Sequence, residues 1–430
     1  MQKIQVYENK NLVGTLCLLE RDACSFAYAK SWLDSSERFA IDPLLPLSDE
    51  IFYRQNLWGA FGDICPDRWG RRIQSRAARK FLSESEYMLS VRDCFRVGAL
   101  RLKIGDEFVS PCFEALDRET PNRKALNFEV PNTINLAHLP QILDSSKRLE
   151  NGTYKDNDLR LLLESSASIG GARPKASIAH NGKLYIAKLP SKNDDTSILQ
   201  WEALMLRLGK MAGINTADFE LIFVKNKPVL LVERFDRDFC TGERVPFMSA
   251  MTLLGASEKE RAEKGRAGRE WAEKEWREWA ENQSYAAIAK KLDSMNKQEL
   301  FRRMVFNALF GNTDDHLKNH ALLYDKACKS WNLSPAYDIN PTPYRYEAQH
   351  HALFFIDAIS LPRVALFREI AALFGVDDAL FLAILESCIN AGEKYKTIAK
   401  EYGIKPKEIK LCAQNFEHKD IENAKKMIEK

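Results

Sequence analysis

The segment Gly311-Asn-Thr-Asp-Asp-His-Leu-Lys-Asn319 carries the pattern that decides the fold, together with Leu333-Ser-Pro-Ala-Tyr-Asp338 downstream. Asp314 stands five positions before Asn319, and Asp338 follows Asn319 by 19 positions. Enzymes that transfer phosphoryl groups in the manner of kinases use one carboxylate to orient or deprotonate the acceptor hydroxyl. They use an amide oxygen and a second carboxylate to hold Mg²⁺ against the triphosphate. The order and spacing therefore predict phosphoryl-transfer chemistry at Asp314, Asn319 and Asp338.

A short hairpin is predicted between the two motifs, from Ala321–Tyr324 and Trp331–Leu333, and it can bring both motifs onto one site. Taken alone, the pattern D-x-x-x-x-N is common by chance, and the paired aspartates could instead cap a helix or a loop. His316 and His320 beside these aspartates could also bind a transition metal. A catalytic zinc site usually has a compact spacing such as H-E-x-x-H, which this sequence lacks, so the kinase-type interpretation is favoured.

Upstream, the glycine-containing loop Ser168-Ile-Gly-Gly-Ala-Arg-Pro-Lys175 leads into two alternating runs, Lys175–His180 and Lys183–Leu189. Asn181-Gly182 joins these runs and is a strong signal for a tight β-hairpin. Backbone N–H groups in a loop of small residues can approach phosphate oxygens without obstruction from a Cβ atom. The loop is neither a Walker A motif nor a G-x-G-x-x-G motif, so an ordinary turn stays an alternative to a phosphate cradle.

Lys188 is flanked by apolar strand residues, which is where kinases place the lysine that holds the α- and β-phosphates. The usual partner of that lysine is a glutamate on a helix, and Glu202 is the candidate here. Its helix is predicted to begin after the capping residues 195–197 and to end at Gly213. The alternative for Lys188 is an edge-strand lysine without a role in catalysis.

Two further strands are predicted after this helix, Phe219–Val224 and Val229–Arg234, with a turn at residues 226–228. Almost everything after about residue 285 has a helical pattern. The order is thus a glycine loop, a strand pair with a lysine, a helix with a glutamate, two more strands and a helical region. It predicts an α+β, two-lobed, protein-kinase-like fold, preceded by an N-terminal mixed α/β subdomain.

Four regions are predicted along the chain. They are an N-terminal subdomain at 1–112, a linker at 113–135, an N-lobe with the glycine loop at 136–235 and a helical C-lobe at 236–430. The linker is inferred from the polar, proline-containing composition of residues 114–132. A basic run at 68–80 and a charged segment with tryptophans at 257–283 are each explained either by a solvated helix face or by a partner surface.

The composition is that of an ordinary globular protein, with 430 residues, 45% hydrophobic and 29% charged, and a formal net charge of +3. This charge offers no argument for a nucleic-acid or membrane surface. The nine cysteines include no C-x-x-C pair, which favours reduced thiols. The N-terminus alternates like a strand, and no run of about 18 apolar residues occurs. We therefore expect a cytoplasmic protein without a membrane segment.

Several of these segments resemble the HipA family of toxin serine/threonine kinases. In the kinase-like part they are Ser168–Lys175, Val232–Arg237, Gly311–Asn319 and Leu333–Asp338. Near the N-terminus, Val13–Leu16, Pro43–Ser48 and Val97–Leu100 are similar to the domain that precedes the kinase lobes in that family. The resemblance covers essentially the whole chain. It departs from the family at the long charged segment 257–283, and at Asp63 and Cys65 in the turn that follows Phe61.

The resemblance implies ATP and Mg²⁺ as cofactors. By motif position it implies Asp314 as the catalytic base, Asn319 and Asp338 as magnesium ligands, and Ser168 as an autophosphorylation site. The ATP-binding residues predicted from the patterns and the resemblance together are Ser168, Gly170, Gly171, Ala172, Arg173, Lys175, Lys188, Glu202, Val232, Glu233, His316 and Lys318. The implied partners are a small DNA-binding antitoxin of the HipB type, operator DNA through that antitoxin, and an aminoacyl-tRNA synthetase as protein substrate.

Two other functions compete with this interpretation. A small-molecule or lipid kinase could use the same Asp–Asn–Asp pattern, and turnover of a small alcohol without any protein substrate would favour it. A catalytically silent scaffold that supports operator binding is the second alternative. The presence of Lys188, Asp314, Asn319 and Asp338 argues against the scaffold, and nucleotide binding distinguishes the two classes.

Overall fold

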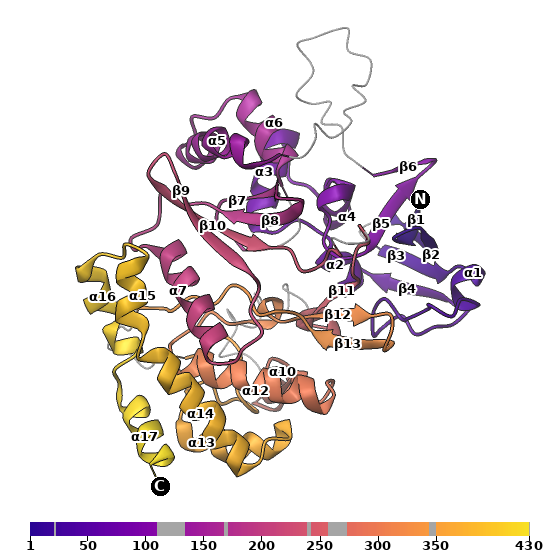
Figure 1. Ribbon diagram of the computed structural model, residues 1–430. Helices are drawn as coiled ribbons and strands as arrows, with labels where there is room; N and C mark the ends of the chain where they lie inside the picture. Colours follow the sequence, from indigo (N-terminus) through magenta and orange to yellow (C-terminus); the bar gives the residue numbers. More distant parts are fainter. Residues whose placement is uncertain are drawn as a thin grey trace. The chain divides into compact units, whose positions relative to one another are not determined.

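The structure is a computed structural model that describes residues 1–20, 23–109, 134–166, 171–238, 242–256, 273–343 and 350–429. The chain divides into two compact units (Figure 1). Unit 1 contains Met1–Asp194, Ile222–Met248 and Tyr324–Lys329, and unit 2 contains Asp195–Leu221, Ser249–Leu323 and Ser330–Lys430. Each unit is described by itself.

Unit 1 begins with an antiparallel six-stranded sheet in the order β4-β3-β2-β1-β5-β6. In β1, Ile4 and Val6 are fully buried and alternate with exposed residues, as period-two patterning predicts. In β2, Val13 and Leu16 are also fully buried, but they stand three positions apart because the register of the β1–β2 pair shifts at Val6/Tyr7. The strands are β1 Gln2–Glu8, β2 Asn11–Leu18, β3 Ala23–Tyr28, β4 Ile51–Gln55, β5 Leu100–Ile104 and β6 Glu107–Phe108. The helices in this part are α1 Lys30–Leu33, α2 Gly59–Asp63, α3 Arg68–Ala78, α4 Glu84–Leu89 and η2 Asp93–Phe95.

The second sheet of unit 1 has the order β7-β8-β10-β9, with β7 Lys175–His180, β8 Lys183–Lys188, β9 Phe219–Val224 and β10 Lys227–Glu233. Both residues of the β7–β8 turn have positive φ, at 49° for Asn181 and 77° for Gly182, which is the backbone that a two-residue hairpin requires. The predicted hairpin is therefore confirmed. The β9–β10 turn differs from the prediction, because Lys225 and Asn226 have positive φ and Pro228 lies inside β10.

One apolar core joins this second sheet to the helices that precede it. Helices α5 Leu139–Asn151 and α6 Asp156–Glu164 lie beside the sheet, and α3 packs with them (Figure 1). The short helix η4 Leu136–His138 leads into α5. The buried side chains of this core include Ile73, Leu159, Ile178 and Leu231. Helix α3 thus belongs to the core of the glycine-loop sheet, although it comes from the N-terminal part of the sequence.

Unit 2 is largely helical. Helix α7 Ile198–Met211 is buried along most of its length and is followed by Gly213 at φ +79°, as the sequence predicts. The small sheet β11-β12-β13 is formed by Phe247–Ser249, Ala321–Asp325 and Ser330–Leu333, and residues 247–248 and 324–325 of its strands are counted in unit 1. The remaining helices are α8 Ala250–Leu253, α10 Glu273–Asn282, α11 Tyr285–Ala289, α12 Ser294–Leu309, η5 Leu317–Asn319, α13 Val364–Ile370, η6 Ala371–Phe374, α14 Asp378–Gly392, α15 Tyr395–Glu401, α16 Pro406–Cys412, η7 Ala413–Asn415 and α17 Lys419–Ile428.

The predicted linker and the charged segment with tryptophans lie partly outside the described residues. The predicted linker 113–135 falls almost entirely within 110–133, which the structure does not describe, and the four predicted region boundaries stay a prediction. Of the charged segment 257–283, only the part from residue 273 onward is described. There Trp276 and Trp279 of α10 pack edge-on against Phe354, at ring-centroid distances of 6.0 and 6.1 Å. This contact is that of a surface helix lying on the helical unit.

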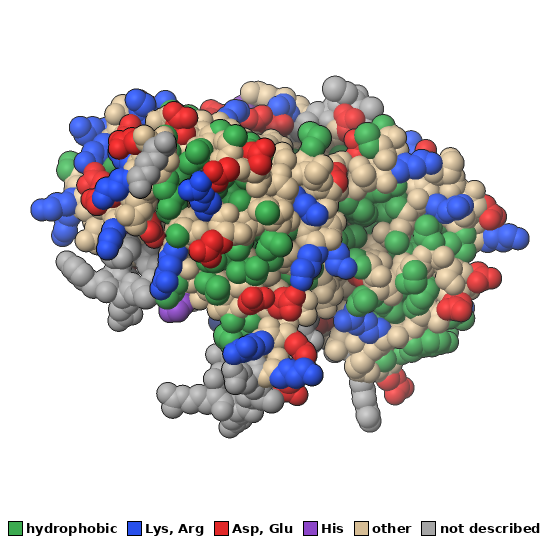
Figure 2. Space-filling view, turned by 90° about the horizontal axis from the view of Figure 1, so that it is seen from below, with side chains coloured by type: hydrophobic (Ala, Val, Ile, Leu, Met, Phe, Trp, Pro, Cys, Tyr) green, Lys and Arg blue, Asp and Glu red, His purple; other side chains and the backbone are tan. Residues whose placement is uncertain are grey.

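Part of the basic run at 68–80 is paired with neighbouring carboxylates. Arg71 pairs with Glu84 at 2.5 Å, and Lys80 pairs with Glu86 at 2.6 Å. On the face drawn in Figure 2, lysine and arginine side chains are interspersed with acidic ones. Among the described residues, no helix combines the length and the apolar character needed to span a bilayer. The cysteines that are described are all free thiols.

Candidate functional site

The loop after α12 presents Asp314 to solvent, whereas Asn312 and Asp315 close to it are buried. Gly311 turns the chain with φ +70°, and Asn312 is buried, where its side-chain nitrogen donates to Asn307 Oδ1 at 3.2 Å. Asp314 is exposed, whereas its neighbour Asp315 is buried. A solvent-facing carboxylate on a loop that is fixed by buried residues is suited to meet an incoming hydroxyl group.

The segment that carries Asp338 runs beside this loop inside unit 2. The Tyr337 hydroxyl donates to the carbonyl oxygen of Lys318 at 2.7 Å. The backbone N–H of Thr342 donates to Gly311 O at 2.8 Å, and the hydroxyls of Thr313 and Thr342 are 2.6 Å apart. Contacts at both ends therefore hold the two motifs together, as the intervening hairpin predicts.

Asn319 and Asp338 offer the oxygen ligands that Mg²⁺ prefers. Asn319 donates through Nδ2 to Asp314 O at 3.4 Å, so its Oδ1 points away from that contact. Asp338 has φ +58°, a left-handed conformation that few non-glycine residues adopt, and such strain is frequent at functional sites. Mg²⁺ is usually held by one or two carboxylates and the phosphates of its nucleotide. One amide oxygen and one carboxylate therefore fit a magnesium ion that is shared with a nucleotide. Within the described residues no group of three or more His, Cys, Asp or Glu could hold a metal ion.

Asp315 anchors this loop through buried hydrogen bonds. Its Oδ2 accepts from Asn307 Nδ2 at 3.0 Å, from His320 Nε2 at 2.9 Å and from the Tyr285 hydroxyl. Burial opposes ionisation of Asp315, but the contacts with His320 and Tyr285 outweigh it and hold the pKa of this carboxyl below its usual range. Burial and the nearby Asp315 charge raise the pKa of Tyr285 well above its usual value. Of the two histidines considered as alternative metal ligands, His320 binds this carboxylate.

His351 is a buried neighbour of the same cluster. Neither of its ring nitrogens has a hydrogen-bond partner among the described residues, and its ring lies 5.1 Å from that of Phe355. Burial lowers the pKa of His351 to about 4, so the ring is neutral at physiological pH.

The glycine loop lies in unit 1, and only its second half is described. Ser168 and Gly170 lie outside the described residues, whereas Gly171 and Ala172 are exposed. A Cβ added at Gly171 would meet no described heavy atom within 4 Å. Arg173 forms an ion pair with Asp194.

Lys175, one of the predicted ATP-binding residues, has partners for its side chain inside unit 1. Its ammonium group is buried, pairs with Asp67 at 2.9 Å and donates to Gly171 O at 2.7 Å. Asp67 is also the N-cap of α3, where it accepts from the backbone N–H of Gly70. Lys175 therefore holds the base of the glycine loop to α3.

The other predicted nucleotide residues divide between the two units. Lys188 ends β8 and pairs in register with Lys175 of β7 and Leu230 of β10. In β10, Val232 is buried and Glu233 pairs with Lys183 at 2.8 Å. Glu202 is buried on α7 in unit 2. The structure thus gathers Asp314, His316, Lys318, Asn319 and Asp338 in unit 2, and Gly171, Ala172, Arg173, Lys175, Lys188, Val232 and Glu233 in unit 1.

Three residues of these arrangements were missed by reasoning from the sequence: Asp67, Asp315 and Tyr337. Asp67 precedes a helix and is recognisable only as a cap, and its ion pair joins residues 108 positions apart. Asp315 stands next to the predicted base but outside the Asp–Asn–Asp spacing. Tyr337 precedes Asp338, and its role depends on the fold of the hairpin between the motifs.

A sheet with a glycine loop and a helical unit with an Asp–Asn–Asp site together define an α+β, protein-kinase-like fold. Comparison with known proteins agrees with this class. A family model described as the HipA-like C-terminal domain matches residues 167–409, and one described as the HipA N-terminal domain matches residues 4–90. The chain belongs to the HipA family.

Similar proteins support the same assignment. The chain is 25% identical over 365 residues to a Sinorhizobium fredii protein named "Putative kinase Y4mE", covering 79% of this chain and 77% of that protein. It is 28% identical over 193 residues to the serine/threonine-protein kinase toxin HipA of Shewanella oneidensis, covering 41% of this chain and 42% of that protein. HipA in a solved Shewanella oneidensis complex of HipA, HipB and operator DNA has the same fold, with a TM-score of 0.64 at 17% identity over 99% of this chain and 96% of the solved one.

Proposed function

We propose that the chain is an ATP-dependent serine/threonine protein kinase and the toxin of a bacterial toxin–antitoxin pair. The observation that carries this proposal is the association of the Asp314–Asn319 loop with the Asp338 segment through Tyr337 and Thr342. The kinase names of its relatives support the activity. The solved complex of the Shewanella protein supports a HipB-type antitoxin and, through it, operator DNA as partners.

In this proposal, residues of the chain position the nucleotide and the acceptor hydroxyl, and one of them deprotonates that hydroxyl. Exposed Asp314 orients the acceptor hydroxyl and takes its proton, while Asn319 and Asp338 hold Mg²⁺, which neutralises charge on the phosphates. Lys188, with Glu202, orders the α- and β-phosphates, and Gly171 and Ala172 contribute backbone N–H groups. The backbone of Val232 and Glu233 receives the adenine. His316 and Lys318 complete the nucleotide site. The proposed substrate is an aminoacyl-tRNA synthetase.

Ser168 is the proposed autophosphorylation site, and its two neighbouring serines are less suitable. Ser165 is buried, and its hydroxyl donates to Leu161 O at 3.1 Å. Ser166 is also buried, and its hydroxyl donates to Leu163 O at 3.0 Å. A hydroxyl that is engaged with helix carbonyls and removed from solvent is a poor phosphoryl acceptor. Ser168 in the glycine loop is therefore the site that we propose.

The test is phosphoproteomics after brief induction of the wild type and of Asp314→Ala, combined with transfer assays on purified protein. We expect Asp314→Ala and Asp338→Ala each to lower transfer by at least about 10²-fold and to relieve growth inhibition. Wild-type protein that phosphorylates a small alcohol but no protein would favour a small-molecule kinase. Wild-type protein that binds no nucleotide would favour a scaffold and would refute the proposal.

A further inference from the structure

The hairpin between the two catalytic motifs ends in a tightly built turn. Strand β12 begins two residues after Asn319, and β13 ends five residues before Asp338. In the turn, Asp325 Oδ1 accepts from the backbone N–H groups of Ala327 and Cys328 at 2.8 and 3.0 Å. Lys329 has φ +52°, which completes the reversal of the chain. The position of this turn is therefore tied to both segments that carry the proposed magnesium ligands.

The N-terminal sheet of unit 1 holds the outer end of this hairpin. Lys326 Nζ lies 3.0 Å from Glu8 Oε1, and the Glu8 side chain is fully buried whereas that of Lys326 is 32% exposed. The rings of Phe39 and Tyr324 lie 4.3 Å apart, and Tyr324 N–H donates to Pro246 O at 3.0 Å. A buried carboxylate needs a cation or several donors to compensate for its lost hydration. Lys326 supplies this cation from the hairpin, and its contact with Glu8 raises the pKa of Lys326 despite partial burial.

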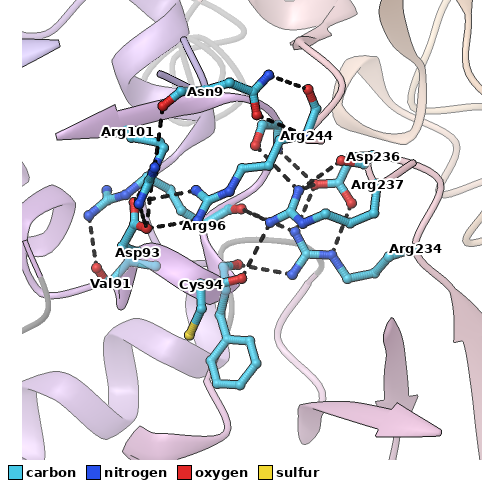
Figure 3. Close-up of polar contacts among 12 residues, drawn as sticks. Asn9, Val91, Asp93, Cys94, Arg96, Arg101, Arg234, Asp236, Arg237 and Arg244 are labelled. Atoms are coloured by element: carbon cyan, nitrogen blue, oxygen red, sulfur yellow. Dashed lines mark hydrogen bonds and ion pairs between the residues drawn. The ribbon is translucent and has the colours of Figure 1, made fainter. Parts of the chain in front are cut away.

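The turn between β1 and β2 joins this contact to the segment that follows β10. Asn9, at φ 49°, donates through Nδ2 to Glu8 Oε1 and to Arg244 O, both at 2.8 Å. Arg244 N–H donates back to Asn9 Oδ1 at 2.9 Å, and the Arg244 guanidinium pairs with Asp93 at 2.7 Å (Figure 3). Glu8 thus belongs to a connected polar network.

The same network holds the end of β10. Buried Asp236 accepts from Arg234, Arg237 and the backbone N–H of Gly98, each at 2.7 or 2.8 Å (Figure 3). The two arginines in turn donate to backbone carbonyls in the turn of residues 94–98. Gly98 has φ +67°, and a Cβ there would lie 2.8 Å from Phe247 Cβ, so this close approach requires glycine. The N-terminal sheet is therefore connected both to the proposed adenine strand and to the hairpin between the catalytic motifs.

We propose that Glu8 is a positioning residue for phosphoryl transfer, because its bond to Lys326 fixes the hairpin whose two ends lead to Asn319 and Asp338. This inference rests on the proposed kinase function. In this inference the N-terminal sheet contributes to phosphoryl transfer itself. Loss of the bond loosens the hairpin, so the two magnesium ligands sample more positions and the metal-bound nucleotide is held less well.

The experiment compares full-length wild type with Lys326→Met, Glu8→Gln and the double variant. The control is Lys425→Met on α17, which breaks an exposed ion pair with Glu393 at the end of α14. Measurements are kcat and kcat/KM, the Mg²⁺ concentration for half-maximal transfer, and backbone hydrogen–deuterium exchange over residues 319–338. We expect each single variant to lose about 3- to 30-fold in kcat/KM, within the range of coupling carried by positioning residues. We also expect a raised Mg²⁺ requirement and faster exchange in the hairpin, while the control stays at wild-type values.

The double variant distinguishes the loss of the Glu8–Lys326 ion pair from a general destabilisation of the fold. Because both single changes remove the same interaction, the double variant should lose little more activity than either single variant. Wild-type kcat, Mg²⁺ requirement and hairpin exchange in Lys326→Met would overturn the inference while leaving the kinase assignment intact. The inference would also be overturned if the two losses of activity add in the double variant, parallel the loss of global stability and leave the Mg²⁺ requirement unchanged. Absence of any transfer by the wild type would overturn the proposed function and this inference together.

Discussion

Replacing Asp315 by alanine should destabilise the chain more than any change at its neighbour Asp314. The Asp315 carboxylate is buried and accepts hydrogen bonds from Tyr285, Asn307 and His320. Leaving a buried donor without a partner costs about 1–3 kcal/mol, and removing one member of a buried charge network costs about 3–5 kcal/mol. Because domains are stable by only about 5–15 kcal/mol, we expect Asp315→Ala to lose a large part of the free energy of unfolding.

The matched comparison is Asp314→Asn, one position away on the same loop but exposed to solvent. It should change the free energy of unfolding by less than about 0.5 kcal/mol, as surface substitutions do, yet lower transfer by at least about 10²-fold. Denaturant unfolding followed by circular dichroism measures the first quantity, and a transfer assay measures the second. If Asp315→Ala unfolds at the wild-type denaturant concentration, then Asp315 does not anchor the loop and the argument is refuted.

Three further predictions concern the nucleotide, pH and modification. Lys188→Ala and Glu202→Ala should each weaken Mg-ATP binding or slow phosphoryl transfer. Calorimetry with a non-hydrolysable analogue measures the binding, and a single-turnover assay measures the transfer. Full activity in both variants would show that Lys188 is only an edge residue. The pKa of His351 is lowered from 6.5 to about 4, so the unfolded chain binds a proton at higher pH than the folded chain. Stability should therefore decline as pH falls from about 6.5 to about 4, and His351→Leu should flatten this part of the curve of unfolding free energy against pH. After incubation with Mg-ATP, mass spectrometry should detect phosphate on Ser168. Ser168→Asp should bind ATP more weakly, because the added negative charge repels the phosphates of ATP. An unmodified Ser168 in active protein would contradict this prediction.

Local signals in the sequence were sufficient for most of the secondary structure around the site. Asn181-Gly182 predicts the β7–β8 hairpin because both residues tolerate positive φ, and the structure has both in that region. The β9–β10 turn was predicted too late in the chain, because Pro228 was interpreted as a turn residue. Pro228 lies near the start of β10, a position where a strand tolerates the missing N–H. The spacing of Asp314, Asn319 and Asp338 identifies candidates because their chemistry depends on residue type and order.

Only the tertiary structure distinguishes residues of the same type by their surroundings. Two adjacent aspartates are equivalent in the sequence, but the fold leaves Asp314 exposed and buries Asp315 among donors from two helices and the end of the loop. Lys175 and Lys188 both lie on the predicted hairpin, yet Lys175 is neutralised by Asp67, 108 positions away. Glu8 and Lys326 are brought together across most of the chain in the same way. Motif spacing is a property of neighbouring positions, whereas burial and ion pairing depend on contacts between distant segments, which the sequence pattern alone does not determine.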